Sequence, residues 1–449
     1  MDTPILDMLR DYVRQQRERW HTPGHKGIQP AQGDFLDWAF DITEIGPMHH
    51  HPTPVERSEA LMAASFSVRR SWYSVQGATL PVIAAILAAN PPGSTLLVDR
   101  SMHRSVLTAL MIGGYRVEWL WPPVLEAGVL LPLEDFPESF AGASGLVIAR
   151  PTYDGLAADV RESIQRAHAK GLNVVVDEAH GSHWRGASFP TSAIDLGADL
   201  IIHGVHKSDA ALTQTGLLHL NSQRIKEEAV DRWMQLLATT SPSYLLLASL
   251  DRLQWERRQP TAQEDWQRFA GRMKELWNTL EKRGVHVLQP WAERRGLEAD
   301  PARLTILGPG PELAEAVAAF GELEKTSPGS ATFFVSPHQD LGRLIGALED
   351  IGTSGDGGLS PIMLPRPPVV LSVRETWGRS SRWVPLKRAR SLVLAEAITP
   401  YPPGIPVAIP GEQVSEDVKD WVLWWHGTGR GHIEGVRQED GQLWIAVLE

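Results

Sequence analysis

The stretch NVVVDEAHGSHW (173–184) joins an uninterrupted apolar run to a cluster of acidic residues, histidines and a tryptophan. Such a run is typical of a strand that is buried on both faces of a parallel sheet. A second segment, LIIHGVHK (200–207), also passes from apolar residues to a polar end. Together the two segments predict an α/β fold whose polar residues gather beyond the ends of buried strands.

Residues 72–220 repeat this pattern, because short apolar runs alternate there with longer helical patterns. Continuous apolar strands that alternate with helices predict a mainly parallel sheet covered by helices on both faces. We expect strands at Trp72–Val75, Thr95–Val98, Arg116–Leu120, Gly145–Ala149, Asn173–Val176 and Leu200–Ile202, and helices at 79–90, 105–114 and 157–171.

Polar clusters follow four of the expected strands: DRSMH (99–103), RPTYDG (150–155), DEAHGSHW (177–184) and HGVHK (203–207). In an open α/β sheet, ligands bind in the crevice outside the carboxyl ends of the strands. Core packing does not explain why four groups of Asp, His, Tyr and Lys residues fall there. The pattern therefore predicts an enzyme.

The length of 449 residues exceeds what one hydrophobic core usually serves. Glycine and proline become frequent beyond about residue 300, as in GPGPEL (308–313) and TSGDGGLSP (353–361). We therefore predict a major domain over residues 1–300, which includes the N-terminal segment, and a smaller α+β C-terminal domain over residues 301–449.

Composition and charge exclude several classes of protein. The absence of cysteine rules out disulfides, thiolate metal sites and a cysteine nucleophile. A net charge of −11 without a basic stripe argues against a nucleic-acid partner. No apolar run is long enough to cross a bilayer, so we expect no membrane association. The N-terminus predicts an amphipathic helix with Ile5, Leu6, Leu9 and Val13 inward, not a signal peptide, which favours a cytoplasmic protein.

Lys207 and Asp177 are the first candidates for chemistry. Lys207 follows a buried strand and His206, and a lysine that loses solvent there has a lowered pKa, as a Schiff-base lysine requires. Asp177 ends the run NVVVD, where its carboxylate is placed to pair with a protonated ring nitrogen of a cofactor. Taken alone, Lys207 also fits a surface lysine, and Asp177 also fits a cap of the following turn.

The turn Gly77–Ala78–Thr79 lies between a strand and a helix whose first turn contains Pro81. Glycine allows close approach of the backbone to a ligand, and the free N–H groups at a helix N-terminus attract phosphate. Thr79 adds a hydroxyl group, although it is also a plain N-cap candidate. The turn is thus a candidate phosphate site.

Histidines supply the remaining candidates. His103 ends a strand beside acidic and basic residues, where its ring is placed to stack on a flat cofactor. His180, His183 and His206 raise the alternative of a metal site near Asp177. Their spacing matches no standard zinc pattern, so we expect no metal.

Motifs spread over most of the chain occur in an order that is specific to one enzyme family. They are HTPGHKG (21–27), FDITEIG (40–46), HHPTPVERSE (50–59), DRSMHRSV (99–106), PTYDG (151–155), VDEAHGSHW (176–184), HKSDAALTQTGLLH (206–219), TTSPSYLLLASLD (239–251) and ITPYPPGIPVAIPGE (398–412). In this order they resemble the Orn/Lys/Arg decarboxylases, fold-type I enzymes that depend on pyridoxal 5'-phosphate. The resemblance implies a role in amino-acid and polyamine metabolism, with arginine, lysine or ornithine converted to the corresponding amine and carbon dioxide.

The resemblance also implies roles for single residues. Lys207 matches the lysine that forms a Schiff base with the cofactor, and Asp177 matches the acid paired with the pyridine nitrogen. His103 matches the ring-stacking histidine, and Ala179 is expected against the opposite ring face. His206 matches a residue near the phosphate and the reacting carbon. The implied catalytic residues are Lys207, His206 and His103.

The phosphate side of the implied cofactor pocket departs from the family pattern. Gly77, Ala78 and Thr79 match the phosphate-binding turn, and His180 and Gly204 belong to the same expected pocket. The family usually has serine where this chain has Ala78 and Gly204, so two hydroxyl donors are lost. Each such hydrogen bond contributes on the order of 1 kcal/mol, or somewhat more to a charged group. Weaker cofactor binding is therefore expected.

Two other readings stay open. The loss of serine at Ala78 and Gly204 is also consistent with a catalytically impaired homologue that acts as a binding or regulatory subunit. A pyridoxal enzyme of another type, such as an aminotransferase, would need an arginine clamp that the sequence does not identify. For a basic substrate, Glu44 and Glu375 are the candidate partners of the distal cation. Fold-type I sites are built between subunits, so the resemblance implies a homodimer or higher homo-oligomer.

Overall fold

The computed structural model describes most of the chain. The described residues are 2–16, 18–19, 21–23, 25–28, 38–43, 51–134, 136–138, 140, 142–327, 329–337, 339, 341–350, 359–362, 364–401, 404–427 and 432–449.

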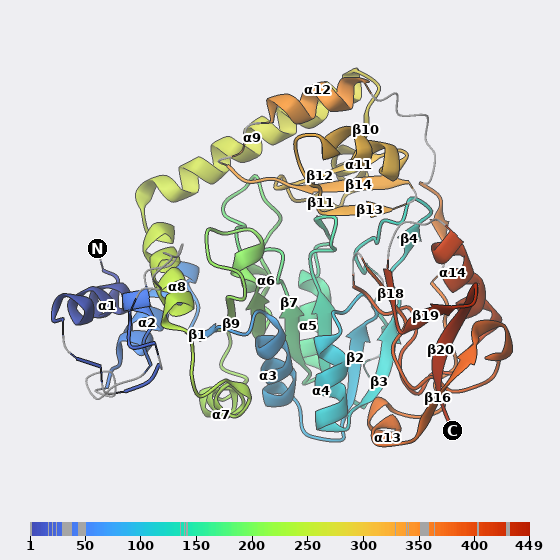
Figure 1. The fold of residues 1–449 in the computed structure, drawn as a ribbon, viewed down its shortest axis with the longest axis horizontal. Coiled ribbons are helices and arrows are strands. Elements are labelled where there is room, and N and C mark those ends of the chain that lie inside the picture. Colours follow the sequence, from blue (N-terminus) through green and yellow to red (C-terminus); the bar gives the residue numbers. More distant parts are fainter. Residues whose placement is uncertain are drawn as a thin grey trace.

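A seven-stranded sheet forms the centre of the molecule (Figure 1), and its strand order is β1-β9-β8-β7-β5-β2-β3. The strands β8, β7, β5, β2 and β3 pair in parallel with their neighbours in this order, whereas β9 pairs antiparallel with both β8 and β1. The strands are β1 (Arg70–Ser74), β2 (Thr95–Asp99), β3 (Arg116–Leu120), β5 (Ala143–Ala149), β7 (Asn173–Asp177), β8 (Leu200–His203) and β9 (Gly216–Leu220). All six predicted strands are confirmed, and β9 is the strand that the prediction lacked.

Side chains alternate between the two faces of this sheet, as the pleat requires. Leu96, Val98 and Val175 belong to one apolar core with α3 (Thr79–Ala89), α4 (Ser105–Gly113) and α7 (Glu227–Leu237). Leu97, Val174 and Val176 belong to the core of the other face, with α5 (Arg161–Ala169) and α6 (Ala193–Leu196). Both faces are therefore covered, which confirms the predicted α/β class.

The expected helix over residues 157–171 begins later than predicted. Leu156–Ala157 form the short strand β6, which pairs with β11 (Glu298–Ala299) in a two-stranded sheet. Because their backbone groups pair with residues far along the chain, they do not enter the helix, and α5 starts at Arg161.

The N-terminal helices pack on one edge of the major body (Figure 1). They are α1 (Pro4–Arg14) and α2 (Pro54–Phe66), with the short 3-10 helix η1 (Trp38–Phe40), and they pack against α8 (Tyr244–Arg257). Ile5 and Leu9 are buried as predicted, whereas Leu6 and Val13 are half-buried. The Asp251 carboxylate accepts hydrogen bonds from the N–H groups of Ile5 and Leu6, which fixes the start of α1.

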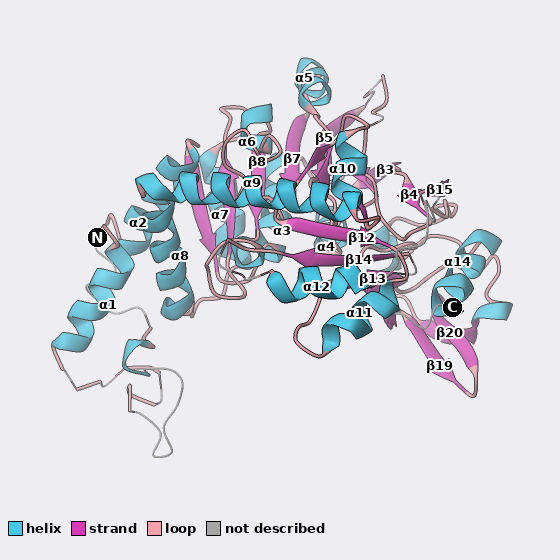
Figure 2. Cartoon of the chain, turned by 90° about the horizontal axis from the view of Figure 1, so that it is seen from above, coloured by secondary structure: helices cyan, strands magenta, loops and turns pink. Residues whose placement is uncertain are grey.

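A second, antiparallel sheet has the order β10-β12-β14-β13. The long helix α9 (Pro260–Lys282), α11 (Gly310–Ala318) and α12 (Gly342–Asp350) cover the same face of this sheet (Figure 1), and they share an apolar core with it. Figure 2 looks onto that face and shows β12 and β14 between α9 and α12. Its strands are β10 (His286–Val287), β12 (Arg303–Leu307), β13 (Lys325–Ser327) and β14 (Ser330–Phe334), and α10 (Leu288–Glu293) joins β10 to β11. Residue 300 lies between β10 and β12, and the domain division at that residue stays a prediction.

The C-terminal part has its own apolar core. A three-stranded sheet in the order β16-β20-β19 packs with α14, and a two-stranded pair β17-β18 lies beside it. Its elements are α13 (Val373–Thr376), β16 (Ser381–Pro385), η4 (Leu386–Arg388), β17 (Thr399–Tyr401), α14 (Glu416–Gly427), β18 (His432–Glu434), β19 (Val436–Glu439) and β20 (Gln442–Leu448), while β4 (Val124–Leu125) pairs with β15 (Pro361–Ile362). Among the helices that the structure describes, none is both long and apolar enough to span a membrane.

Candidate active site

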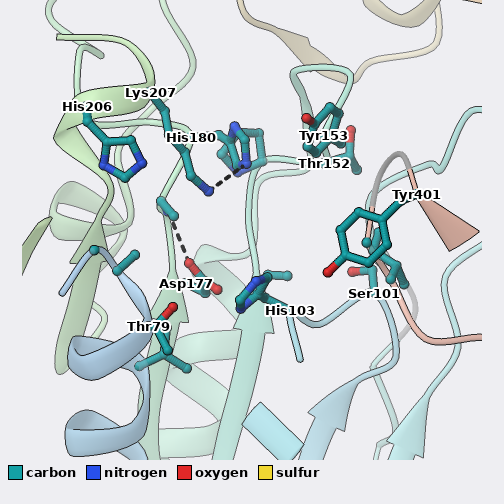
Figure 3. Close-up of a pocket in the computed structure, with 18 of the residues that line it drawn as sticks. Thr79, Ser101, His103, Thr152, Tyr153, Asp177, His180, His206, Lys207 and Tyr401 are labelled. Carbon is teal, nitrogen blue, oxygen red and sulfur yellow. Dashed lines mark hydrogen bonds between the residues drawn. The ribbon is translucent and has the colours of Figure 1, made fainter. Parts of the chain in front are cut away.

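A cavity of about 500 Å³ opens beyond the carboxyl ends of β2, β5, β7 and β8 (Figure 3). It lies where the four polar clusters of the sequence were expected to meet. The structure brings together there most of the residues predicted for a cofactor pocket: Gly77, Ala78, Thr79, His103, Asp177, Ala179, His180, His206 and Lys207.

Lys207 ends the 3-10 helix η3 (Val205–Lys207), directly after β8. Its Nζ atom lies 3.0 Å from Nε2 of His180, and a hydrogen bond joins the two (Figure 3). Burial lowers the pKa of the Lys207 ammonium group, although the Asp177 carboxylate opposes the shift. A larger share of Lys207 is therefore a neutral, nucleophilic amine than for a lysine in water.

His180 is neutral at physiological pH. Burial and the neighbouring Lys207 charge hold the pKa of His180 well below its usual range. The Tyr153 ring packs beside it, with ring centroids 5.0 Å apart. The sequence placed His180 in the pocket, and the structure adds its direct contact with the Lys207 amine.

Asp177 and His103 lie on the floor of the cavity (Figure 3). Asp177 ends β7, and its Oδ1 atom accepts a hydrogen bond of 3.1 Å from the Ala179 N–H. His103 accepts a hydrogen bond at Nδ1 from the Ser105 N–H, at 3.2 Å, so its Nε2 atom carries the proton. Burial lowers the pKa of His103, against the opposing effect of Asp177, which keeps the ring neutral.

The N-terminus of α3 borders the cavity without a side-chain cap. Ala78 is the N-cap residue and has no oxygen to accept from the first N–H groups of the helix. The turn before it needs Gly77, whose φ is +65°, and its N–H donates to the Gln214 carbonyl at 2.9 Å. A Cβ atom at Gly216 would lie 2.5 Å from the Gly77 oxygen, so glycine is also needed there. The first N–H groups of α3, which no side chain caps, are therefore suited to an anion.

The three histidines considered as possible metal ligands, His180, His183 and His206, each make a different contact. His206 donates from Nδ1 to the Thr215 carbonyl oxygen at 2.6 Å, which leaves its Nε2 atom as an acceptor. Burial lowers the pKa of His206. His183 is fully buried against Asp300 at 3.0 Å, and His180 contacts Lys207. Within the described ranges, no three His, Asp or Glu side chains are grouped to hold a metal ion.

Gly204 lies behind the Lys207 side chain, and it does not line the cavity. A Cβ atom there would meet the Ala179 carbonyl oxygen at 3.0 Å and the Lys207 Cδ atom at 3.2 Å. Gly204 directly precedes η3, and its backbone lies against the aliphatic part of the Lys207 side chain. Gly204 is thus absent from the lining of the cavity, and its expected place near a bound phosphate stays a prediction.

The two acids predicted for the substrate have different outcomes. Glu44 lies outside the described residues. Glu375 completes a capping box at the start of α13, where its carboxylate accepts from the Ser372 N–H at 2.8 Å. The Glu375 side chain is exposed and its carboxylate is already hydrogen-bonded in this cap. Glu375 does not line the cavity of its own chain.

The structure adds cavity residues that the sequence analysis did not identify, among them Ser101, Thr152, Tyr153, Gln214 and Tyr401. Ser101 and Tyr153 stand inside clusters that had been singled out, so the strand-end pattern itself was the available signal. Tyr401 comes from β17 in the C-terminal part. No pattern along the chain indicates that this residue reaches the ends of β2 and β5.

The fold and this cavity define a fold-type I α/β enzyme with a lysine at the ends of parallel strands. A family model for the major domain of Orn/Lys/Arg decarboxylases matches residues 3–294, and the model for their C-terminal domain matches residues 372–449. The chain belongs to the Orn/Lys/Arg decarboxylase family.

Individual relatives agree with this assignment. The chain is 28% identical to an arginine decarboxylase of Bacillus anthracis over 94% of this chain and 92% of that protein. It is 29% identical to an arginine decarboxylase of Bacillus subtilis, with 94% and 93% covered. Among solved structures, the constitutive lysine decarboxylase of Escherichia coli superposes with a TM-score of 0.84 at 21% identity, covering 100% of this chain and 82% of that one. This last likeness establishes the fold.

Proposed function

We propose that the chain is a pyridoxal-phosphate-dependent decarboxylase of basic amino acids, with arginine as its first expected substrate. The observation that carries this is the Lys207 amine, whose pKa is lowered, in the same cavity as Asp177, His103 and the uncapped end of α3. Arginine is favoured because relatives named arginine decarboxylase match at 28–29% identity, against 23% for the constitutive lysine decarboxylase of Escherichia coli.

The residues at the cavity fit pyridoxal phosphate. The N–H groups at the start of α3 suit its phosphate, and the Lys207 amine suits its aldehyde. The Asp177 carboxylate suits its pyridine nitrogen. His103 and Ala179 both line the cavity beside Asp177, where they suit the two faces of a flat ring.

The chain's own groups prepare the reaction. When bound, the cofactor supplies a protonated ring that accepts the electron pair left behind as carbon dioxide departs. Asp177 would hold a proton on that ring nitrogen. Lys207, neutral in part because it is buried, is the amine that attaches the cofactor. Lys207 Nζ and His206 are the groups available to return a proton to the substrate α-carbon.

Assembly and location are part of the proposal. Leu212 is 52% exposed and directly precedes the cavity residues Thr213 and Gln214. Fold-type I active sites are built between subunits, and this supports cover of the mouth by a second copy of the chain. We therefore propose a homodimer or larger homo-oligomer that acts in the cytoplasm, in polyamine and amino-acid metabolism.

The direct test is turnover. Purified protein with pyridoxal phosphate is incubated separately with arginine, lysine and ornithine, and carbon dioxide and the product amines are measured. We expect agmatine and carbon dioxide in equal amounts from arginine. If none of the three yields a product, the proposal fails and a binding or regulatory role becomes the better account.

Substituting Ala78→Ser is expected to strengthen cofactor binding. A serine at the N-cap of α3 provides a hydroxyl group that can donate to the phosphate, worth on the order of 1 kcal/mol and thus about fivefold in the dissociation constant. The same change at Gly204 should bring no gain, because its Cβ atom would press on the Ala179 oxygen at 3.0 Å. Titration of apoprotein with pyridoxal phosphate, followed by visible absorbance, compares the two variants. Equal tightening by both would contradict the placement of Gly204 behind the lysine stem.

A further inference from the structure

The cavity has no evident partner for the distal cation of a basic substrate. Of the described residues that line it, Asp177 is the single carboxylate, and it lies on the floor beside His103. A guanidinium or ammonium group that leaves water needs an anion near its bound position. We therefore expect this partner at the rim of the cavity. The following inference rests on the proposed function.

Glu324 stands at this rim through its contact with Tyr153. Tyr153 lines the cavity beside His180, and its hydroxyl group donates a hydrogen bond to Oε1 of Glu324. Among the contacts of the described residues, Glu324 makes no ion pair and its Oε2 atom has no partner. The carboxylate is thus exposed, oriented by Tyr153 and available to a cation.

The two loops that carry this pair are fixed to one another by their next residues. Asp154 and Lys325 form a buried ion pair with an Oδ2–Nζ distance of 2.6 Å, and both side chains are almost fully buried. Thr332 Oγ1 also donates to Asp154 at 2.5 Å. The Glu324 N–H donates to the Thr332 carbonyl at 3.1 Å. Because this network holds the backbone on both sides, Glu324 is preorganised beside Tyr153 and pays little ordering entropy on binding.

The negative charge of Glu324 is felt at the reacting end of the cavity. It is one of the charges that raise the pKa of Lys207, against the larger lowering caused by burial. The nearby cation Arg303 also feels Glu324, which is one of the carboxylates that raise its pKa, but its ion pair is with the buried Asp300 and it donates to Ser208 at 3.2 Å. Leu130 and Pro151 also line the cavity and offer apolar surface for a methylene chain.

We propose that Glu324, oriented by the Tyr153 hydroxyl group, binds the distal cation of the amino-acid substrate and so determines the preference for basic side chains. In this arrangement the α-amino end lies at Lys207, the methylene chain passes Leu130 and Pro151, and the guanidinium group meets the free oxygen of Glu324. Glu324 is a specificity residue and takes no part in bond breaking.

The test uses the holoenzyme and the Glu324→Gln variant. We expect the dissociation constant of agmatine, measured by calorimetry, and the KM for arginine to rise about 10- to 100-fold, as the loss of a charge-assisted hydrogen bond implies. The visible absorbance of bound cofactor and the kcat should change little. Tyr153→Phe should give a smaller effect in the same direction, because it frees the carboxylate without removing it.

Glu322→Gln is the matched control, since Glu322 is an exposed glutamate two residues earlier on the same loop. It should leave agmatine binding and KM unchanged. If Glu324→Gln behaves like this control while the wild type decarboxylates arginine, the inference is wrong and the proposed function stands. If the wild type decarboxylates nothing, the proposed function fails, and the agmatine titration alone decides whether Glu324 binds cations.

Discussion

Replacing Lys207 by alanine is expected to abolish both cofactor attachment and turnover. Lys207 is the single lysine among the described residues that line the cavity, so no neighbouring amine is placed to substitute for it. The loss of proton transfer alone should reduce kcat by on the order of 10²- to 10⁴-fold, and loss of the covalent attachment should lower it further. This is the largest catalytic effect we expect from any single substitution.

The measurement combines two readouts on the same protein. Visible absorbance of the bound cofactor should disappear in Lys207→Ala, and carbon dioxide release from arginine should fall to background. Lys282→Ala is the control, because Lys282 is exposed at the end of α9 and should leave both signals intact. A Lys207→Ala protein that keeps its absorbance and more than about a hundredth of its turnover would disprove the assigned role.

The buried sheet could be predicted because its signal is local. Runs such as NVVVD show no alternation, since side chains on both faces of the strand meet helices, and Val174 and Val175 indeed belong to different cores. The polar residue that ends each run marks the point where the strand leaves the core. For that reason the sequence alone is enough to identify Asp177, His103 and Lys207 as candidate site residues.

Contacts between distant segments could not be predicted in this way. The pairing of Leu156–Ala157 with Glu298–Ala299 shortened a helix whose own sequence is compatible with an earlier start. Tyr401 reaches the cavity from the C-terminal part, and Gly204 turns behind Lys207. Each of these depends on three-dimensional packing between segments, for which hydrophobic periodicity carries no information.

Replacing Glu412 by alanine is expected to cause a large loss of stability. Glu412 and Arg100 form an ion pair at 2.9 Å, with side chains 1% and 0% exposed. The Arg100 guanidinium group also donates to the Val407 carbonyl and lies 4.7 Å from the Trp119 ring centroid and 5.2 Å from that of Trp121. Removing Glu412 leaves this cation buried without a counter-ion. We expect the free energy of unfolding to fall by about 3–5 kcal/mol.

A surface pair between the same two parts of the chain provides the control. Arg104 and Glu434 lie 3.0 Å apart but are 58% and 46% exposed. Glu434→Ala should therefore cost at most about 1 kcal/mol. Urea unfolding, followed by tryptophan fluorescence, measures both variants. Equal stability losses would show that burial does not govern the contribution of the Arg100–Glu412 pair.

The position of the buried pair links its stability to the active site. Arg100 lies between Asp99, at the end of β2, and the cavity residues Ser101 and His103. Glu412 follows Tyr401 in the C-terminal part, and Tyr401 lines the cavity beside Ser101 (Figure 3). The double change Arg100→Met with Glu412→Leu leaves no buried charge and should recover most of the stability lost in Glu412→Ala. If that double variant is stable but has a raised KM for arginine, the pair is retained because it positions Tyr401 relative to Ser101 and His103. A stable double variant with wild-type kinetics would instead limit the role of the pair to holding the C-terminal part in place.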